Sequence, residues 1–266
     1  MSSIMPSADT KRESNQKRAY IQAQWCAPKN VQAFSTTRIG GYSLEQYSGF
    51  NLAEHVGDNY QTVKKNRNLL ISDLELAQSP LWLEQVHGVE VVDGAGDANK
   101  SSAIQADASF SSQSNHVCVV MTADCLPVLF CNKQGTWVAA AHAGWRGLAN
   151  GVIQNTIDSY QGDSSDIIAW LGPAISQKHF EVGDDVRQIF VQNNPDFARA
   201  FIESDIGTGA GKYRCDLYGI SRMILAQHGI EVFGGDFCTF SEPSQFYSYR
   251  RDGETGRMVS LIWINQ

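Results

Sequence analysis

The chain has 266 residues, a formal net charge of −7 and a hydrophobic share of 42%. No apolar run approaches the roughly 20 residues of a membrane span, and the acidic balance argues against a nucleic-acid-binding surface, which usually carries a net basic face. We therefore expect no membrane or nucleic-acid partner, although this charge is compatible with a local basic pocket for a small anion.

Three features of the sequence predict its organisation. Residues 1–19 are polar and lack the apolar centre of a signal peptide, so we expect a disordered lead-in to a cytoplasmic protein. No later stretch resembles a linker, which favours a single domain over residues 20–266, as a monomer or weak homodimer. The six cysteines are scattered without C-x-x-C pairs, as is typical of reduced thiols in a cytosol.

The proposed domain opens with β-forming segments at 20–26 and 31–37, which predict a pair of strands. Arg38 follows beside the glycines of a turn, where it is either a solvated loop residue or an anion-binding one. Residues 59–74 then place apolar side chains at helical spacing between charges. This pattern predicts an amphipathic helix lying on a sheet.

The next segments are short and rich in β-formers. Residues 81–88 predict a strand that ends at His87 and a glycine. The backbone can approach a ligand closely beside glycine, so His87 is a candidate ligand, although a packed histidine fits the same pattern. Further strands are predicted at 106–110 and 117–122.

A hairpin is the strongest local prediction. Residues 127–131 and 137–141 are rich in β-formers and flank a four-residue turn that contains glycine. Antiparallel pairing of these strands places Cys125, just before the first, and His142, just after the second, at the same end of the hairpin. The sequence therefore predicts that these two side chains share a site.

The segment after His142 combines a glycine-bearing turn with a helix. Residues 148–160 have apolar side chains at helical spacing, and the turn over 143–147 leads from the strand into that helix. Backbone N–H groups at such a turn suit a phosphate or carboxylate, and Arg146 would add a fork of donors. We therefore expect an anion site beside Cys125.

The remaining segments complete a mixed pattern of helices and strands. Residues 167–171 predict a buried strand, and 181–190 predict a helix with Asp184 as its N-cap. A second capped helix is predicted over 216–227. The C-terminal segment 259–264 predicts another buried strand.

One hypothesis for the chemistry is a metal site. His87, Cys125 and His142 each lie at the end of a predicted strand, and together they offer two imidazoles and one thiolate. Zinc prefers such N and S ligands, and three protein ligands leave its fourth tetrahedral position for water or substrate. Their spacing matches no zinc finger or knuckle, so the pattern alone leaves other interpretations open.

Three other interpretations compete with an open zinc site. In a cysteine hydrolase, Cys125 would be the nucleophile and His142 its base. A copper site is the second, with Met121 as a remote axial ligand, although six histidines in the whole chain are few for a multi-copper oxidase. A zinc site without a catalytic role is the third.

Several longer motifs follow one another along the chain. They are Thr37-Arg38 with Gly40-Gly41, Asn51-Leu52, Asn66-Arg67, Gln85–Gly88, Thr122–Pro127, Ala141–Gly147, Leu171–Ala174 with Glu181–Gly183, Ser248–Gly253 and Thr255–Met258. In these motifs the chain resembles the YfiH family, also called the laccase-domain or multicopper polyphenol oxidase family, the purine nucleoside phosphorylase family and the peptidoglycan editing factor. Residues 176–180 lack the cysteines that some relatives carry, but those cysteines are not part of the proposed metal site.

The resemblance implies a fold, a metal and an activity. The fold would be a single α+β domain of mixed sheets with α/β/β/α layers, similar to the catalytic domain of cytotoxic necrotizing factor. The resemblance implies zinc, with copper as the alternative, held by His87, Cys125 and His142. It implies phosphorolysis of adenosine, inosine, guanosine and methylthioadenosine, together with hydrolytic deamination of adenosine. A copper polyphenol oxidase, or a cysteine or zinc amidohydrolase editing peptidoglycan precursors, are the alternatives.

These reactions assign a role to an acidic residue. Deamination needs an activated water and an acidic side chain that shuttles protons, as in other zinc deaminases. Asp124, beside Cys125, is the candidate for this catalytic role together with the three ligands. Capping of the turn at Cys125 is the alternative role of Asp124.

Phosphorolysis also needs an anion site beneath the ribose and stabilisation of the positive charge that develops on the sugar. Arg38, Arg146 and Arg250 are the candidates for binding phosphate. Trp145 or Tyr249 is expected to stack on the base. Ion pairs for the arginines and core packing for the aromatic residues are the alternative roles.

Overall fold

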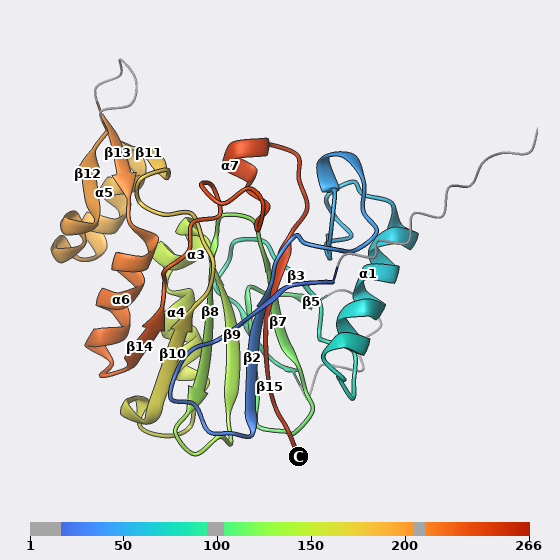
Figure 1. The fold of residues 1–266 in the computed structure, drawn as a ribbon. Coiled ribbons are helices and arrows are strands. Elements are labelled where there is room, and N and C mark those ends of the chain that lie inside the picture. The colour runs from blue at the N-terminus through green and yellow to red at the C-terminus, as the bar shows by residue number, and fades with distance from the viewer. Residues whose placement is uncertain (1–16, 95–103, 205–210) are drawn as a thin grey trace, which may run out of the picture.

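The computed structural model of the chain describes residues 17–94, 104–204 and 211–266, so most of the expected lead-in lies outside the described residues. Two large sheets lie face to face in the centre, and helices cover both outer faces (Figure 1). This confirms the expected α+β fold with α/β/β/α layers. Among the described helices, none is long and apolar enough to cross a membrane.

The first large sheet has four strands in the order β1-β2-β15-β7, all antiparallel to their neighbours. Its outer face packs against helix α1, which begins after Asn59, whose side chain accepts a hydrogen bond from the Thr62 N–H. Leu70 of α1 belongs to the apolar cluster between helix and sheet. The elements are β1 (Tyr20–Gln22), β2 (Val31–Thr36), β7 (Cys118–Thr122), β15 (Met258–Ile264) and α1 (Tyr60–Asp73).

The second large sheet has six strands in the order β14-β10-β8-β9-β6-β4, with parallel pairs at its two edges. Four helices contribute to its outer side (Figure 1). The strands are β4 (Val91–Asp93), β6 (Ala108–Ser111), β8 (Leu126–Asn132), β9 (Val138–Ala143), β10 (Ile167–Leu171) and β14 (Glu231–Gly234). The helices are α3 (Trp145–Asn150), α4 (Val152–Asp158), α5 (Asp184–Asn193) and α6 (Leu217–Gln227).

Smaller elements flank these layers. Two minor sheets have the orders β11-β13-β12 and β3-β5. A short helix, α7, lies in the loop before β15. The bounds are β3 (Leu83–Glu84), β5 (Ile104–Gln105), β11 (Glu181–Gly183), β12 (Phe201–Glu203), β13 (Lys212–Cys215), α7 (Tyr249–Asp252) and the 3-10 turns η1 (Glu45–Tyr47), η2 (Ser164–Asp166) and η3 (Pro195–Ala200).

Strands β8 and β9 form the predicted hairpin at the centre of the molecule. Pro127 pairs with His142 and Leu126 with Ala143, so Cys125 and His142 lie at the same end, as predicted. Both faces of the hairpin are buried, and Ala140 of β9 faces the four-stranded sheet. A strand buried on both faces has a continuous apolar sequence, and small side chains let the two sheets approach closely.

Three local predictions were wrong. The strand predicted at 81–88 is limited to β3, because the following N–H groups bond to a side chain instead of a neighbouring strand. The helix predicted at 148–160 starts earlier and is split into α3 and α4 at Gly151, which has a left-handed φ of 101°. Asp184 is the first residue of α5 and not its N-cap, which is Gly183.

Close packing of the two sheets predicts the effect of one substitution. Ala140→Leu adds three carbon atoms at a fully buried position of β9, and overpacking should lower the free energy of unfolding by roughly 1–3 kcal/mol. Equilibrium urea unfolding measures the change. Gln192→Leu, on the exposed side of α5, is the control and should stay within about 0.5 kcal/mol of the wild type. Equal stability of Ala140→Leu and the wild type would contradict this packing.

Candidate metal centre

His87, Cys125 and His142 come together at one end of the six-stranded sheet. One ligand atom from each of them lies within 4.8 Å of the others. Cys125 Sγ is 3.8 Å from His87 Nε2, and the two imidazole rings are 4.8 Å apart between centroids at an angle of 71°. The structure therefore brings together the three residues that the sequence suggested as ligands.

The hairpin delivers two members of this set. His142 is the penultimate residue of β9, and Cys125 directly precedes β8. The chain reverses before Cys125 through Asp124, which has a left-handed φ of 86°. Asparagine and aspartate are the non-glycine residues that adopt this conformation most readily, so an aspartate suits the turn.

His87 lies in a loop that two side chains hold in place. The Gln85 amide donates to the Met121 carbonyl and accepts from the Met121 N–H, at 2.9 and 2.7 Å, which ties the loop to β7. The buried Asp107 carboxylate accepts the backbone N–H groups of Val86, His87 and Gly88 at 3.1, 3.0 and 2.6 Å. His87 can therefore hold a φ of 60° without a neighbouring strand.

Asp107 also orients the second imidazole. His142 Nδ1 lies 2.7 Å from Asp107 Oδ1, a distance at which the ring N–H donates to the carboxylate. Burial would raise the pKa of Asp107, but His142 and the N–H groups of Gly88 and Val86 lower it, so the carboxylate is ionised. The His142 Nε2 atom is thereby left for a ligand, in the arrangement that fixes many metal-binding histidines.

The same contacts activate the thiol. Burial would raise the pKa of Cys125, but the neighbouring His142 and His87 lower it to about 6. Burial would lower the pKa of His142, but Cys125 and Asp107 raise it. A thiolate at neutral pH is the form in which cysteine either attacks a substrate or binds a metal.

Gly144 leaves room for the three side chains. A Cβ atom at this position would lie 2.8 Å from His87 Cδ2 and 3.1 Å from Cys125 Sγ. The φ of Gly144 is −62°, so its backbone would accept another residue, and the lack of space is what requires glycine. The first glycine of the Ala141–Gly147 motif therefore has a packing role at the site.

These residues fit a zinc ion. Two nitrogens and one sulfur are the donors that zinc prefers, and three protein ligands are typical of a zinc site that keeps one position open. The Asp107 contact supplies the orientation that metal-binding histidines usually have. The same donors also suit copper, so the chemistry of the set favours a transition metal without selecting one.

A cavity of about 490 Å³ opens beside the three residues. This volume lies within the usual range for small-molecule sites. The cavity is lined by the end of β7, the turn at Cys125, the start of α3 and the segment from α7 to β15. Its described walls include Met121, Asp124, Phe180 and Arg257.

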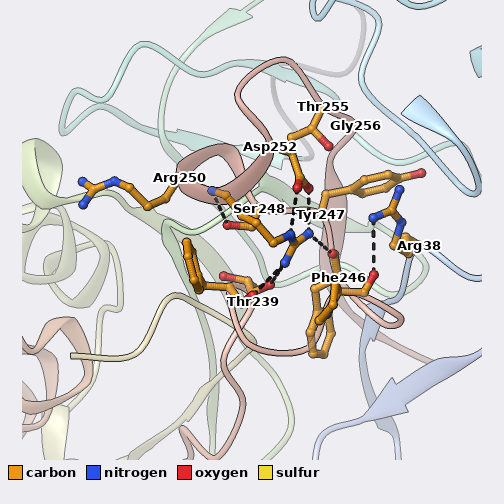
Figure 2. A network of polar contacts seen from close by, with 12 residues as sticks. Arg38, Thr239, Phe246, Tyr247, Ser248, Arg250, Asp252, Thr255 and Gly256 are labelled. Carbon is orange, nitrogen blue, oxygen red and sulfur yellow. Dashed lines mark hydrogen bonds and ion pairs between the residues drawn. The ribbon is translucent and has the colours of Figure 1, made fainter. Parts of the chain in front are cut away.

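The predicted substrate residues do not all lie in this cavity. Trp145, Arg146, Tyr249 and Arg250 line it. Arg38 does not: its guanidinium donates to the Ser48 and Pro243 carbonyls and lies 4.6 Å from the centroid of the Tyr247 ring. In Figure 2, Arg38 and Arg250 lie on opposite sides of the polar network around α7.

Asp124 connects the metal centre to α7. Its two oxygens accept hydrogen bonds from the Thr239 hydroxyl at 2.6 Å and from the Arg250 N–H at 2.7 Å. Arg251 strengthens this region by donating to the carbonyls of Thr239 and Phe246 and pairing with Asp252. Asp124 therefore lines the cavity and also fixes the helix that carries Tyr249 and Arg250.

Sequence reasoning missed three residues of the site, namely Asp107, Arg257 and His55. Asp107 lies in a predicted strand, where a single carboxylate within an apolar run was the available signal. Arg257 belongs to the Thr255–Met258 motif and received no role. His55 lies in a polar loop that offers no such signal, and it reaches the cavity only through the fold.

Comparisons with known proteins extend this description. The model of a family described as multi-copper polyphenol oxidoreductase laccase matches residues 32–265. The chain is 49% identical to the Escherichia coli purine nucleoside phosphorylase YfiH, over 92% of this chain and 98% of the relative. It is 46% identical to a Pseudomonas aeruginosa protein also named purine nucleoside phosphorylase, with the same coverage of both chains.

A solved structure shows the same fold. The crystal structure of a Neisseria meningitidis protein superposes with a TM-score of 0.87 at 48% sequence identity. The match covers 93% of this chain and 99% of the Neisseria protein. The layered arrangement is therefore shared with a protein of similar length.

The hydrogen bonds of Asp107 lead us to predict that one substitution at this position lowers the affinity of the site for zinc. Asp107→Asn keeps the size of the side chain but weakens the bonds to three N–H groups and to His142, so affinity for zinc should fall about 10- to 100-fold. Competition with a chromophoric chelator measures the affinity. The matched control is Asp163→Asn, which changes a carboxylate on the distant η2 turn and should bind zinc like the wild type. Unchanged affinity in Asp107→Asn would contradict the orienting role.

The Cys125 environment predicts the pH dependence of a labelling reaction. After treatment with a chelator, the alkylation rate of Cys125 by iodoacetamide should rise with pH through an apparent pKa of about 6, because only the thiolate reacts. The pKa of an unperturbed cysteine thiol is about 8.5. Peptide mass spectrometry distinguishes Cys125 from the exposed Cys26. A midpoint above about pH 8 would show that the histidines do not stabilise the thiolate.

Proposed function

The chain belongs to the multi-copper polyphenol oxidoreductase laccase family, and we propose that within this family it is a zinc-dependent purine nucleoside phosphorylase. One observation carries the proposal: an open set of two imidazoles and one thiolate lies in a cavity that also presents arginine side chains. The names of the relatives with 46–49% identity support the choice of substrate.

His87, Cys125 and His142 would hold the zinc ion, which would supply a Lewis acid beside the cavity. Asp107 keeps the His142 ring in one orientation and the loop of His87 in place. The site would be ready before the substrate arrives, because the ligands are held by buried hydrogen bonds.

Phosphorolysis replaces the glycosidic bond of the nucleoside with a bond between the ribose and phosphate. An oxygen of phosphate bonds to C1′ of the ribose, while the glycosidic bond breaks and its electron pair moves to the purine, which takes up a proton. Tyr249 and Asp124 both line the cavity. Tyr249 would stack on the base, and Asp124 would put a negative charge near the sugar, where positive charge develops. Guanosine, inosine, adenosine and methylthioadenosine share the purine and the sugar on which these contacts act.

We also propose deamination of adenosine at the same site. Water adds to C6 of the base, and ammonia leaves after proton transfer through an acidic side chain. Asp124 is suited to this transfer, because each carboxylate oxygen has a second lone pair beyond its bond to Thr239 or Arg250. The products are inosine and ammonia.

The family description keeps a copper oxidase as the second candidate. The donor set suits copper, and Met121 lies on the wall of the cavity. A multi-copper oxidase needs several metal sites, whereas one cluster of three such ligands occurs in the parts of the chain that the structure describes. This observation favours the phosphorylase.

The thiols support a location in the cell. All six cysteines are free, and four of them are buried. Reduced thiols are typical of a cytosol, so we propose that the protein acts on small molecules in the cytoplasm.

Metal analysis combined with chromatography tests the function. The zinc-loaded protein should release adenine from adenosine only with phosphate present, and should form inosine with or without it. His87→Ala and Cys125→Ala should lose at least about 100-fold in rate, because each removes a ligand. Cys26→Ala changes an exposed cysteine away from the site and serves as the control. Zinc-loaded protein that forms neither product, or full activity in Cys125→Ala, would contradict the proposal.

A further inference from the structure

Arg257 lies beside the metal centre because of the pairing between β15 and β7. Met258, the first residue of β15, pairs with Thr122, the last residue of β7. The preceding residue, Arg257, is therefore level with the start of the turn that carries Asp124 and Cys125. It lines the same cavity as the three ligands.

The side chain of Arg257 is only partly used by the protein. Its Nη1 group donates to the carbonyls of Thr255 and Gly256 at 2.7 and 3.0 Å. No carboxylate of the described residues forms an ion pair with it, whereas the nearby Arg251 pairs with Asp252 at 2.7 Å. A guanidinium has five N–H donors, so Arg257 keeps donors for a ligand.

Partial burial of an arginine without a paired carboxylate costs free energy, because the charged group loses contact with water. Burial lowers the pKa of Arg257, and the negative charges of Cys125 and Asp124 oppose that shift without a hydrogen bond to the guanidinium. The two Asp124 oxygens are already bonded to Thr239 and Arg250. An anion bound in the cavity would offset the desolvation free energy of Arg257, because a desolvated charge is stabilised most by a partner that is hydrogen-bonded to it directly.

The charge of Arg257 also affects a second residue of the cavity. Burial lowers the pKa of His55, and Arg257 and Arg67 lower it further, so the imidazole is neutral near pH 7. Arg67 is already paired with Glu54, at 3.1 Å. Arg257 is therefore a source of positive charge that acts on a second residue of the same cavity.

We propose that Arg257 is the residue that binds the phosphate co-substrate, through a charge-assisted contact beside the turn of Cys125. The proposal rests on the phosphorylase function and assigns its anion site. All three arginines of the cavity contact its wall, and Arg257 lies 5.9 Å from the Tyr249 ring, but the other two are more exposed. Arg250 donates to the Glu181 carbonyl and lies over Phe180, and Arg146 lies 4.3 Å from the Trp145 ring. Arg146 and Arg250 are therefore exposed to solvent, whereas Arg257 is half-buried.

Substitution of Arg257 should separate the two activities. Arg257→Gln should raise the KM for phosphate about 10- to 100-fold, the range expected for loss of a hydrogen bond to a charged group. The KM for adenosine in phosphorolysis and the rate of deamination, which uses no phosphate, should change less than about threefold. Arg257→Lys should recover part of the affinity, because it restores the charge but not the planar fork.

Two other arginine variants serve as controls for Arg257→Gln. Arg199→Gln removes an equal charge from the surface, where Arg199 pairs with the exposed Asp196, and should leave both KM values unchanged. Arg38→Gln tests whether Arg38, the first of the arginines that the sequence suggested for binding phosphate, contributes to that binding. Zinc content and thermal unfolding of each variant show whether it folds and binds metal like the wild type.

Calorimetric titration with inorganic phosphate tests the site without turnover. Zinc-loaded wild type should bind phosphate, and Arg257→Gln should bind it at least about tenfold more weakly. Equal phosphate binding in both, or a loss in Arg38→Gln but not in Arg257→Gln, would overturn the proposal. A wild type that binds phosphate through Arg257 but releases no purine base would instead refute the phosphorylase function while leaving the anion site in place.

Discussion

The hydrogen bonds of the Asp107 carboxylate are the interaction on which the site depends. One buried side chain accepts three backbone N–H groups from the loop of His87 and one ring N–H from His142. It thereby holds two candidate ligands that are far apart in the sequence in one arrangement. A neutral side chain could accept fewer of these bonds and would bind the imidazole less strongly.

The cavity is assembled from the ends of both large sheets. The six-stranded sheet supplies Cys125 and His142 through its central hairpin, and the four-stranded sheet supplies Arg257 through β15. Because the two sheets pack closely through small residues such as Ala140, their ends lie near enough for one small molecule to contact both. The layered fold therefore puts a cysteine thiol and a guanidinium on the wall of the same cavity.

The local pattern of the sequence was sufficient to predict part of the site. Cys125 and His142 could be placed together from the sequence, because hairpin register depends on alternation over adjacent segments. Local pattern could not show that Arg257, which received no role from the sequence, lines the cavity, whereas Arg38 does not. Both lie at the same end of the four-stranded sheet, but β15 is next to β7 and β2 is one strand further away. That order depends on pairing between segments separated by more than a hundred residues, which no local pattern records.

The position of β15 has a consequence for synthesis. This strand lies between β2 and β7, although it follows every other described strand along the chain. During translation, β2 and β7 have no strand to join them until β15 leaves the ribosome, so the four-stranded sheet and the wall containing Arg257 are completed last. Pairing across such a separation is slow compared with helix or hairpin formation. The nascent protein would therefore expose the edges of β2 and β7 until β15 has been synthesised, and such unpaired edges can associate with other chains.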